Sequence, residues 1–298
     1  MTRSVFITFI FAAVVAVLIV PSAAHGQSPS TNSTASTPTP ATQAASDDDD
    51  GRLDPAEPDF VVINLPSTLR LPLHKGNFHM SHRFEGNLRD GSFTDQLSNF
   101  FGVDVGAAIS LEYRFGIMKH LEAIVSRANR GRVIAFSAKY DGWHQSATLP
   151  VSVSGVVSIE GENNFGANSG TASKNYAPAL GLVVSRTIGG RYALYAMPFW
   201  VGKTGIDATA DGNTGFLGLG ARVRFGGSNY LSAEVSPRLG GFVIGDPEYG
   251  FAIEKRVGAH VFALTFTNGT SNTTYRQIAR GGAPSHLHLG FNLTRKFF

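Results

Sequence analysis

The chain has 298 residues, no cysteine, and 25 basic against 22 acidic side chains, which gives a formal net charge of +3. The lack of cysteine excludes a disulfide framework and a lipid-modified cysteine anchor. The basic residues are scattered rather than clustered, so nucleic acid is not an expected partner.

The beginning of the chain has the pattern of an export signal. Arg3 precedes the apolar run FITFIFAAVVAVLIV, and small residues follow Pro21. This order is typical of a cleaved secretory signal peptide, which we place at residues 1–26, and a retained membrane anchor is the alternative. Residues 27–59 are rich in Ser, Thr, Pro, Ala and Asp, so we expect them to form a disordered low-complexity linker.

One short pattern within this linker resembles a calcium-binding loop. Oxygen-bearing side chains, including Asp48 and Asp50, and a glycine occur at EF-hand spacing between Ser46 and Glu57. The first ligand position holds serine rather than aspartate, and Pro55 obstructs the helix that should follow the loop. A solvated acidic spacer is therefore the preferred interpretation of this pattern.

Twelve later segments have strand character and are separated by glycine-rich or polar breaks. They are 76–85, 104–115, 121–127, 133–140, 150–160, 175–188, 192–202, 214–225, 230–237, 248–257, 260–268 and 287–298. Many of them alternate between apolar and polar residues, as extended strands with one apolar face do. In the second segment, for example, Ile109, Leu111 and Tyr113 share one face, whereas Glu112 and Arg114 share the other.

The connections between these segments alternate in length. Long gaps such as 86–103 and 269–286 alternate with tight ones such as 116–120 and 189–191. Bacterial outer-membrane barrels have this asymmetry, with the tight turns on the periplasmic side. Closure also removes exposed strand edges and satisfies the backbone polar groups in lipid. We therefore predict an all-β fold, in which residues 60–298 form a single antiparallel transmembrane β-barrel of about 12 strands, with the linker hanging in the periplasm.

The carboxyl end and several internal blocks resemble known barrels. The chain ends in HLHLGFNLTRKFF, and this amphipathic strand resembles the terminal strand through which the barrel-assembly machinery recognises its substrates, finishing on Phe298. The blocks SNFFGVDVGAAISLEYRFGIMKHLEAIVSR, AFSAKYDGW, PVSVSG and EKRVGAHVFALTFTNGT are similar to successive blocks of a bacterial family described only as a membrane-bound β-barrel domain of unknown function. The resemblance implies a barrel in outer-membrane lipid, but the family supplies no reaction, substrate or binding residue.

Nine charged side chains fall on the polar faces of the strands and are candidates to line the lumen. They are Glu112, Arg114, Glu122, Glu160, Arg222, Arg224, Glu234, Glu254 and Arg256. They either form an ion-pair lattice that fills a narrow barrel or line a pore of mixed charge. The spacing places Arg114 opposite Glu122 and Arg222 opposite Glu234, and it leaves Arg224 without a close partner. An unpaired arginine needs water, so we expect a wet lumen that favours anions.

Motifs for catalysis and cofactor binding are incomplete. AMPFWVGKTG ends like a phosphate-binding loop, but Met197 stands where the first glycine is required. His286 and His288 share a face, yet His79 on the adjoining strand would lie more than about 10 Å away at roughly 3.3 Å per residue, so we expect no metal site. An outer-membrane phospholipase would need serine and asparagine beside His82 on the lipid-facing wall, and the sequence offers neither in register.

These observations favour a small pore or transport channel for hydrophilic solutes in the bacterial outer membrane, without an enzymatic activity and without a cofactor. A structural or adhesion barrel with a filled lumen is the alternative, and a phospholipase-like enzyme is less favoured. An open pore and a filled barrel need the same residue types at the same places, so the sequence does not separate these two hypotheses.

Overall fold

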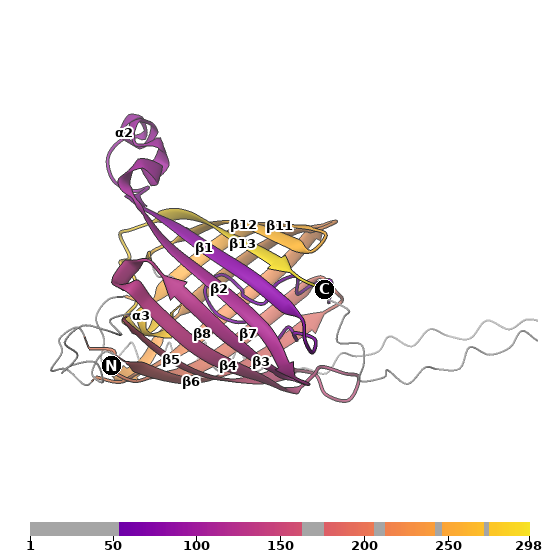
Figure 1. The fold of residues 1–298 in the computed structure, drawn as a ribbon. Coiled ribbons are helices and arrows are strands. Elements are labelled where there is room, and N and C mark those ends of the chain that lie inside the picture. The colour runs from indigo at the N-terminus through magenta and orange to yellow at the C-terminus, as the bar shows by residue number, and fades with distance from the viewer. Residues whose placement is uncertain (1–53, 163–175, 206–211, 242–245, 271–273) are drawn as a thin grey trace, which may run out of the picture.

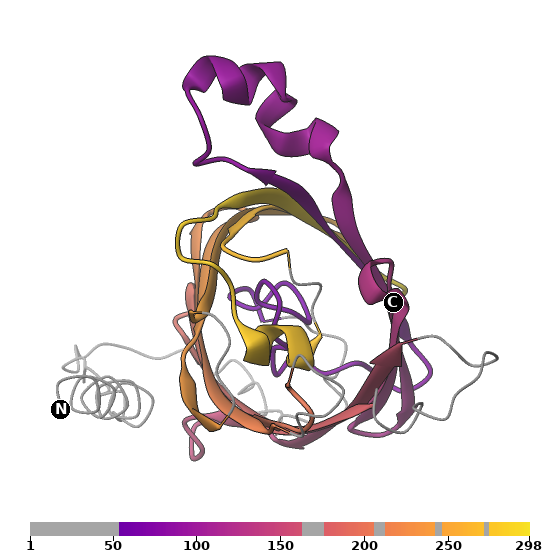
Figure 2. The same cartoon turned by 90° about the vertical axis from the view of Figure 1, so that its left-hand side faces the viewer.

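The computed structural model describes residues 54–162, 176–205, 212–241, 246–270 and 274–298. Twelve antiparallel strands close into a barrel (Figures 1 and 2). They are β1 (Gly76–Asn87), β2 (Ala107–Met118), β3 (Leu121–Ala128), β4 (Val133–Trp143), β5 (Ser152–Glu162), β6 (Ala177–Ile188), β7 (Tyr192–Val201), β8 (Thr214–Gly226), β9 (Asn229–Ser236), β11 (Glu248–Val257), β12 (His260–Thr267) and β13 (His288–Lys296). Each strand pairs with its neighbours along the chain, and β1 pairs with β13 to complete the ring.

Several short elements lie in the connections. The strand β10 (Arg238–Gly241) follows β9 and pairs with the beginning of β8. The helices α2 (Phe93–Ser98) and η2 (Phe100–Val105) lie between β1 and β2, η3 (Arg130–Arg132) lies between β3 and β4, and α3 (Tyr275–Arg280) lies between β12 and β13. In the part of the chain that the structure describes, no helix is both long enough and apolar enough to span a membrane.

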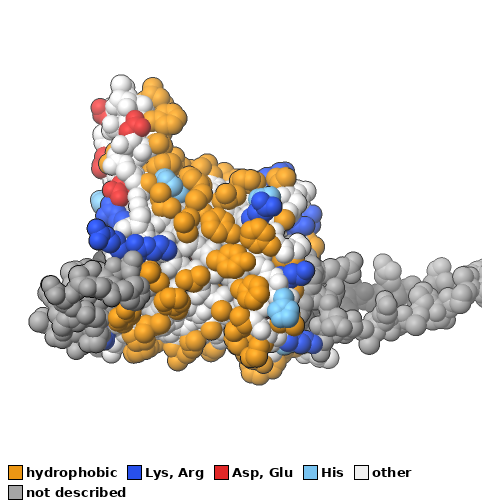
Figure 3. All heavy atoms as spheres, viewed as in Figure 1, with side chains coloured by type: hydrophobic (Ala, Val, Ile, Leu, Met, Phe, Trp, Pro, Cys, Tyr) orange, Lys and Arg blue, Asp and Glu red, His pale blue; other side chains and the backbone are white. Residues whose placement is uncertain are grey.

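The predicted closed barrel of twelve antiparallel strands is confirmed, and so is the alternation of faces. Leu111, Tyr113 and Phe115 on β2 are exposed on the outer wall, whereas Glu112 and Arg114 between them are buried on the inner face. Figure 3 shows hydrophobic side chains spread over the face of the outer wall that is in view. Such a wall is the surface that lipid covers in a membrane barrel.

The two ends of the barrel differ. The tight connections β2–β3, β6–β7, β8–β9 and β11–β12 lie at one end, together with the beginning of β1 and the end of β13, where Asn77 pairs with Lys296. We call this the tight-turn end and the opposite one the loop end. In outer-membrane barrels the tight turns face the periplasm.

The lumen is occupied by the segment that precedes β1. Residues 54–71, which we call the plug, form a hairpin inside the ring of strands (Figure 2), and both of its legs lie at the tight-turn end. The first leg passes Tyr230, whose hydroxyl donates to the Pro55 carbonyl at 3.0 Å. The hairpin turns deep in the barrel, where the Val62 N–H donates to the Leu65 carbonyl at 2.8 Å, and the chain then reaches β1 beside Gly116.

This plug corrects the expectation that a linker extending to residue 59 hangs in the periplasm, because the residues from Ala56 to Asp59 are buried in the lumen. The physical reason lies in the next residues of the chain. The run FVVINL, residues 60–65, is apolar but belongs to no strand, so it must be covered. In a membrane barrel the lumen is the place where a non-strand segment can be both covered and hydrogen-bonded.

Candidate functional site in the plugged lumen

The tip of the plug is bound by a carboxylate of the wall. One oxygen of Glu234 on β9 accepts hydrogen bonds from the backbone N–H groups of three consecutive plug residues, at 3.2, 3.3 and 3.1 Å. These residues are Ile63, Asn64 and Leu65. Consecutive N–H groups in a turn form a concave site for an anion, and a buried carboxylate needs such donors to offset its loss of water. Glu234 therefore fixes the plug at its deepest point.

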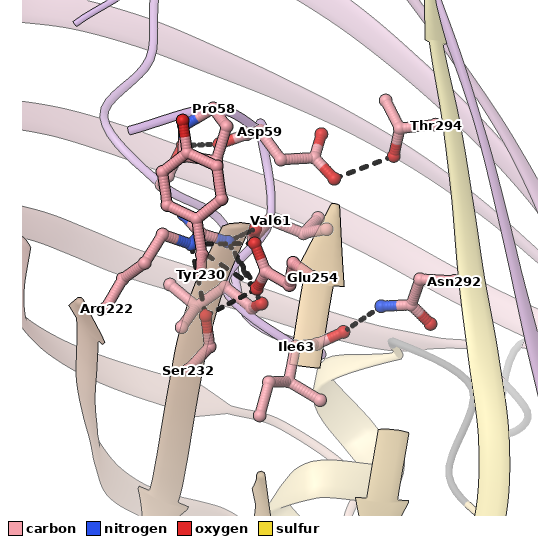
Figure 4. A network of polar contacts seen from close by, with 12 residues as sticks. Pro58, Asp59, Val61, Ile63, Arg222, Tyr230, Ser232, Glu254, Asn292 and Thr294 are labelled. Carbon is pink, nitrogen blue, oxygen red and sulfur yellow. Dashed lines mark hydrogen bonds and ion pairs between the residues drawn. The ribbon is translucent and has the colours of Figure 1, made fainter. Parts of the chain in front are cut away.

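Next to the tip, a buried arginine holds the first leg of the plug (Figure 4). Arg222 on β8 donates to the carbonyl oxygens of Val61 at 2.8 Å and Val62 at 3.2 Å. The same guanidinium forms an ion pair with Glu254 of β11 at 3.0 Å, and Ser232 of β9 bonds to both side chains. Arg222 thus joins three strands of the wall to the plug backbone.

A buried lysine on the opposite side of the lumen holds the returning leg. Lys139 on β4 donates to the carbonyl oxygens of Leu69 at 2.6 Å and Ser67 at 3.3 Å. Its ammonium lies 3.4 Å from a carboxylate oxygen of Glu122 and 3.4 Å from one of Asp141, and it is fully buried. The lysine is therefore neutralised by the wall and still free to donate to the plug.

Strand β13 binds the plug through polar side chains at every second position, all of which point into the lumen. Asn292 donates to the Ile63 carbonyl at 2.9 Å, Thr294 donates to the Asp59 carboxylate at 2.7 Å, and Lys296 donates to the Pro58 carbonyl. Figure 4 shows the first two of these contacts, from Asn292 to Ile63 and from Thr294 to Asp59. The plug therefore runs along β13 in a fixed register.

The apolar side chains of the tip fill the space between these polar contacts. Val62, Ile63 and Leu65 belong to one buried cluster with Met197 and Phe199 of β7. The wall makes room for them with glycine, since a methyl group at Gly218 would lie 2.3 Å from Leu65. The plug and the wall are thus complementary in shape as well as in charge.

The loop end of the lumen is covered by α3. The ring of Tyr275 stacks on Phe199 with a centroid separation of 4.5 Å, and Ile278 and Ala279 are fully buried. The backbone N–H of Arg276 donates a hydrogen bond to the Glu160 carboxylate at 3.4 Å. Helix α3 contacts β6, β7 and β8 and lies across the middle of the barrel mouth (Figure 2).

The structure buries seven of the nine candidate lumen residues inside the barrel, and the other two are partly exposed. The seven are buried on the inner face: Glu112, Arg114, Glu122, Glu160, Arg222, Glu234 and Glu254. Arg224 and Arg256 are partly exposed near the tight-turn end, and Arg224 donates to the carbonyl of Gly227 in the β8–β9 turn. Arg224 is therefore not an unpaired charge within the lumen.

The predicted pairings need two corrections. Arg114 bonds to Glu122 at 3.1 Å, but it lies opposite Ile124 in the ladder because the strands continue to a tight turn beside the Met118–Leu121 pair. The predicted pairing of Arg222 with Glu234 is wrong. The ladder places Arg222 opposite Ser232. The strands turn at Gly227 and Ser228, and an irregularity lies between Arg224 and Gly226; together they shift β9 by two residues from the predicted register. Glu234 is thereby left for the plug.

Several residues that bind the plug were not among the candidates, namely Arg83, Lys139, Asn292, Thr294 and Lys296. All five occupy inward positions of their strands, where a charged or amide side chain needs a buried partner. The period-two pattern that selected Glu112 and Arg114 also applies to Lys139, so this signal was present in the sequence.

The histidines and the acidic segment have other surroundings. The Nδ1 atom of His79 lies 2.9 Å from the hydroxyl oxygen of Thr294. His82 stacks on Phe291 on the outer wall. Among the described residues, no three His, Cys, Asp or Glu side chains gather as metal ligands do. Asp48 and Asp50 lie outside the described residues, and Glu57, which closes the calcium-like pattern, is buried and accepts from the Thr68 N–H at 3.2 Å.

Comparisons with known proteins agree with the barrel. Residues 59–297 match the family model described as "Membrane bound beta barrel domain (DUF5777)". No curated protein sequence matches the chain.

Solved structures with a similar outline include the NanC porin, with 7% identity, a TM-score of 0.46, and coverage of 75% of this chain and 99% of that one. An outer membrane channel from Pseudomonas putida F1 has 8% identity, a TM-score of 0.47, and coverage of 76% and 97%. The outer membrane protein Omp33 of Acinetobacter baumannii has 7% identity, a TM-score of 0.38, and coverage of 75% and 98%.

Proposed function

Because the chain belongs to the membrane-bound β-barrel domain family (DUF5777), we propose that it is a bacterial outer-membrane channel for small hydrophilic solutes that its own plug holds shut. The observation that carries the proposal is the way the wall binds the plug. Three charged side chains of the wall form hydrogen bonds with backbone groups of the plug and not with its side chains, namely those of Arg222, Lys139 and Glu234. Water can replace backbone groups as partners of these charges, so the wall is suited to a wet lumen after the plug has left.

The path of the plug also suits withdrawal. Both legs leave at the tight-turn end, near Tyr230 and Gly116, so the hairpin can retract without threading the chain through the barrel. The chain contains no cysteine, and therefore no disulfide holds the plug to the wall. Its retention depends on noncovalent contacts alone.

The charges of the wall indicate the kind of solute. Among the described residues, seven buried carboxylates and five buried basic side chains point into the lumen from the strands. The carboxylates belong to Glu112, Glu122, Asp141, Glu160, Glu234, Glu248 and Glu254, and the basic groups to Arg83, Arg114, Lys139, Arg222 and Lys296. This excess of carboxylates favours cations. The earlier expectation of anion preference depended on Arg224, which lies near the β8–β9 turn.

The proposed location follows from the ends of the chain and from the outer wall. Residues 1–26 direct export, the terminal strand ending at Phe298 is presented to the barrel-assembly machinery, and outer-membrane lipid covers the apolar wall. Neither an enzymatic activity, a cofactor nor a nucleic-acid partner is part of this proposal.

Deletion of residues 54–69 tests the proposal. The shortened barrel, once folded in detergent as judged by its altered gel migration without boiling, should give long-lived conductance steps in planar bilayers with a preference for cations. The full-length protein should conduct rarely and briefly under the same conditions. A folded and inserted barrel without the plug that passes no current would refute a channel function.

A permanently filled structural barrel is the second candidate. The observation that favours it is the burial of Val62, Ile63 and Leu65 in one apolar cluster with residues of the wall, because each side chain would lose its cover upon withdrawal. This candidate predicts that the full-length barrel never conducts, even though removal of the plug opens a path. Long recordings of the intact protein therefore separate the two candidates.

A further inference from the structure

The connection between β1 and β2 forms a separate projection at the loop end. Residues 88–106, which we call the flap, contain α2 and η2 and stand out sideways from the barrel wall (Figures 1 and 2). Viewed along the barrel axis, the flap extends away from the ring and does not cover the lumen (Figure 2). Its position is therefore beside the barrel, above the place where lipid surrounds the wall.

The flap exposes large apolar side chains. Phe93 is 73% exposed, Leu97 55% and Phe100 61%. Phe93 and Leu97 are four residues apart in α2 and so lie on one face of the helix. A soluble surface rarely gathers several large apolar side chains in so short a segment, and such a patch usually marks a contact.

The arrangement of these side chains has a direction. Figure 3 shows the hydrophobic side chains of the flap on the side toward the apolar band of the barrel wall, and the acidic side chains mainly on the side away from it. An amphipathic element that lies at a membrane surface presents its apolar side to lipid and its charged side to water. The apolar side of the flap is thus continuous with the surface that lipid already covers.

The flap is also held in a defined shape. Gly86 and Gly102 meet backbone to backbone at its base, where a methyl group on Gly86 would lie 2.2 Å from the Cα atom of Gly102. Ser92 and Asp95 form reciprocal capping hydrogen bonds at the start of α2. Phe100 and Phe101 both have positive φ angles, 46° and 55°, which bulky residues rarely adopt. The backbone is therefore constrained in a form that leaves Phe100 exposed.

We propose that the flap seats its apolar side in the lipid leaflet at the loop end of the barrel, which is the outer leaflet when the tight turns face the periplasm. Phe93, Leu97 and Phe100 contact the boundary between headgroups and acyl chains, and the acidic side faces the water. The occupant is lipid and not a second copy of the chain, because the apolar side faces along the barrel axis toward the band that lipid covers and not outward in the plane of the membrane.

Spin labels provide the test, because the chain has no cysteine and a single one can be labelled uniquely. Leu97→Cys places the label on the apolar side, and Asp90→Cys places the matched control on an exposed acidic position of the same flap. The full-length protein is reconstituted in phosphatidylcholine and phosphatidylglycerol nanodiscs that hold one barrel each. At Leu97 the label should be several-fold more accessible to oxygen than to a water-soluble nickel complex, and at Asp90 the order should be reversed.

The outcomes separate lipid from the alternatives. Equal nickel accessibility at both positions in nanodiscs would overturn the proposal, since the flap would then stand in water. Another outcome is a label at Leu97 that is protected from nickel only in crowded vesicles and shows spin–spin broadening there. The apolar side would then contact a second copy of the chain and not lipid, which would also overturn the proposal. Replacing Phe93 and Phe100 with serine in the Leu97→Cys protein should shift the label toward water while the barrel remains folded.

Discussion

The lumen is filled from its two ends by segments that are held in different ways. The plug enters at the tight-turn end and is bound through its backbone by charged side chains of the wall, such as Glu234, Arg222 and Lys139. Helix α3 covers the loop end, where Tyr275 stacks on Phe199 and the backbone N–H of Arg276 donates to Glu160. Water can replace the backbone groups of the plug as hydrogen-bond partners of these charged side chains, but it cannot replace a stacked aromatic ring. Under the proposed channel function, the plug is therefore the movable part and α3 the fixed part.

The largest effect is expected from Arg222→Met. This change leaves Glu254 buried without its ion-pair partner, and breaking a buried pair in this way costs about 3–5 kcal/mol of folding stability. The unfolding midpoint in denaturant, followed by gel migration without boiling, measures it. Arg224→Met, two residues along the same strand and partly exposed, is the matched control and should change stability by less than about 1 kcal/mol. Equal effects of the two changes would contradict the buried network.

The second prediction concerns α3. Tyr275→Ala removes the ring that stacks on Phe199 and should destabilise the barrel by about 3 kcal/mol, as truncation of a buried aromatic ring does. Because the plug still closes the lumen, openings of this variant in single-channel recordings should be as rare as those of the unchanged protein. Frequent opening would show that α3, and not the plug, is the barrier.

The third prediction isolates the tip of the plug. Glu234→Gln removes the charge that accepts three backbone N–H bonds, and hydrogen bonds to a charged group contribute about 1.5–3 kcal/mol. The fraction of time spent open should therefore rise roughly ten- to a hundred-fold, at about 1.4 kcal/mol per factor of ten. Glu112→Gln, whose carboxylate bonds to Arg114 of the wall, is the control and should leave the open fraction unchanged. An equal change in the open fraction of both variants would show that Glu234 does not hold the plug in place.

The strands could be predicted from the sequence because alternation is a local property, visible within a single segment such as Ile109 to Tyr113. The pairing of Arg222 could not, since it depends on the position of the β8–β9 turn and on the irregularity between Arg224 and Gly226. Together these shift the register by two residues, which keeps every side chain on its correct face. The plug was missed for a different reason. Ile63 and Glu234 are 171 residues apart, and only the closed barrel brings them together.

The smallest effect is expected outside the lumen, at α2. The backbone N–H and the hydroxyl of Ser92 donate to the Asp95 carboxylate and hold the pKa of Asp95 below its ordinary value of 3.8. The cap is therefore complete above that ordinary pKa and is lost as the pH falls through the lowered one. Hydrogen exchange at the α2 amides should speed up in that acidic range while exchange in the barrel strands stays slow. Ser92→Ala should show fast α2 exchange at neutral pH already.

The most direct measurement of the central claim is single-channel recording of a barrel whose plug can be tied to the wall. The hydroxyl oxygens of Thr68 in the plug and Ser185 on β6 lie 2.5 Å apart, so Thr68→Cys with Ser185→Cys places two thiols within reach of a disulfide. The oxidised protein should never conduct, and a reducing agent should restore the rare openings of the unchanged barrel, whereas either single cysteine should not respond. Conductance that persists when the disulfide is closed would contradict closure of the lumen by the plug.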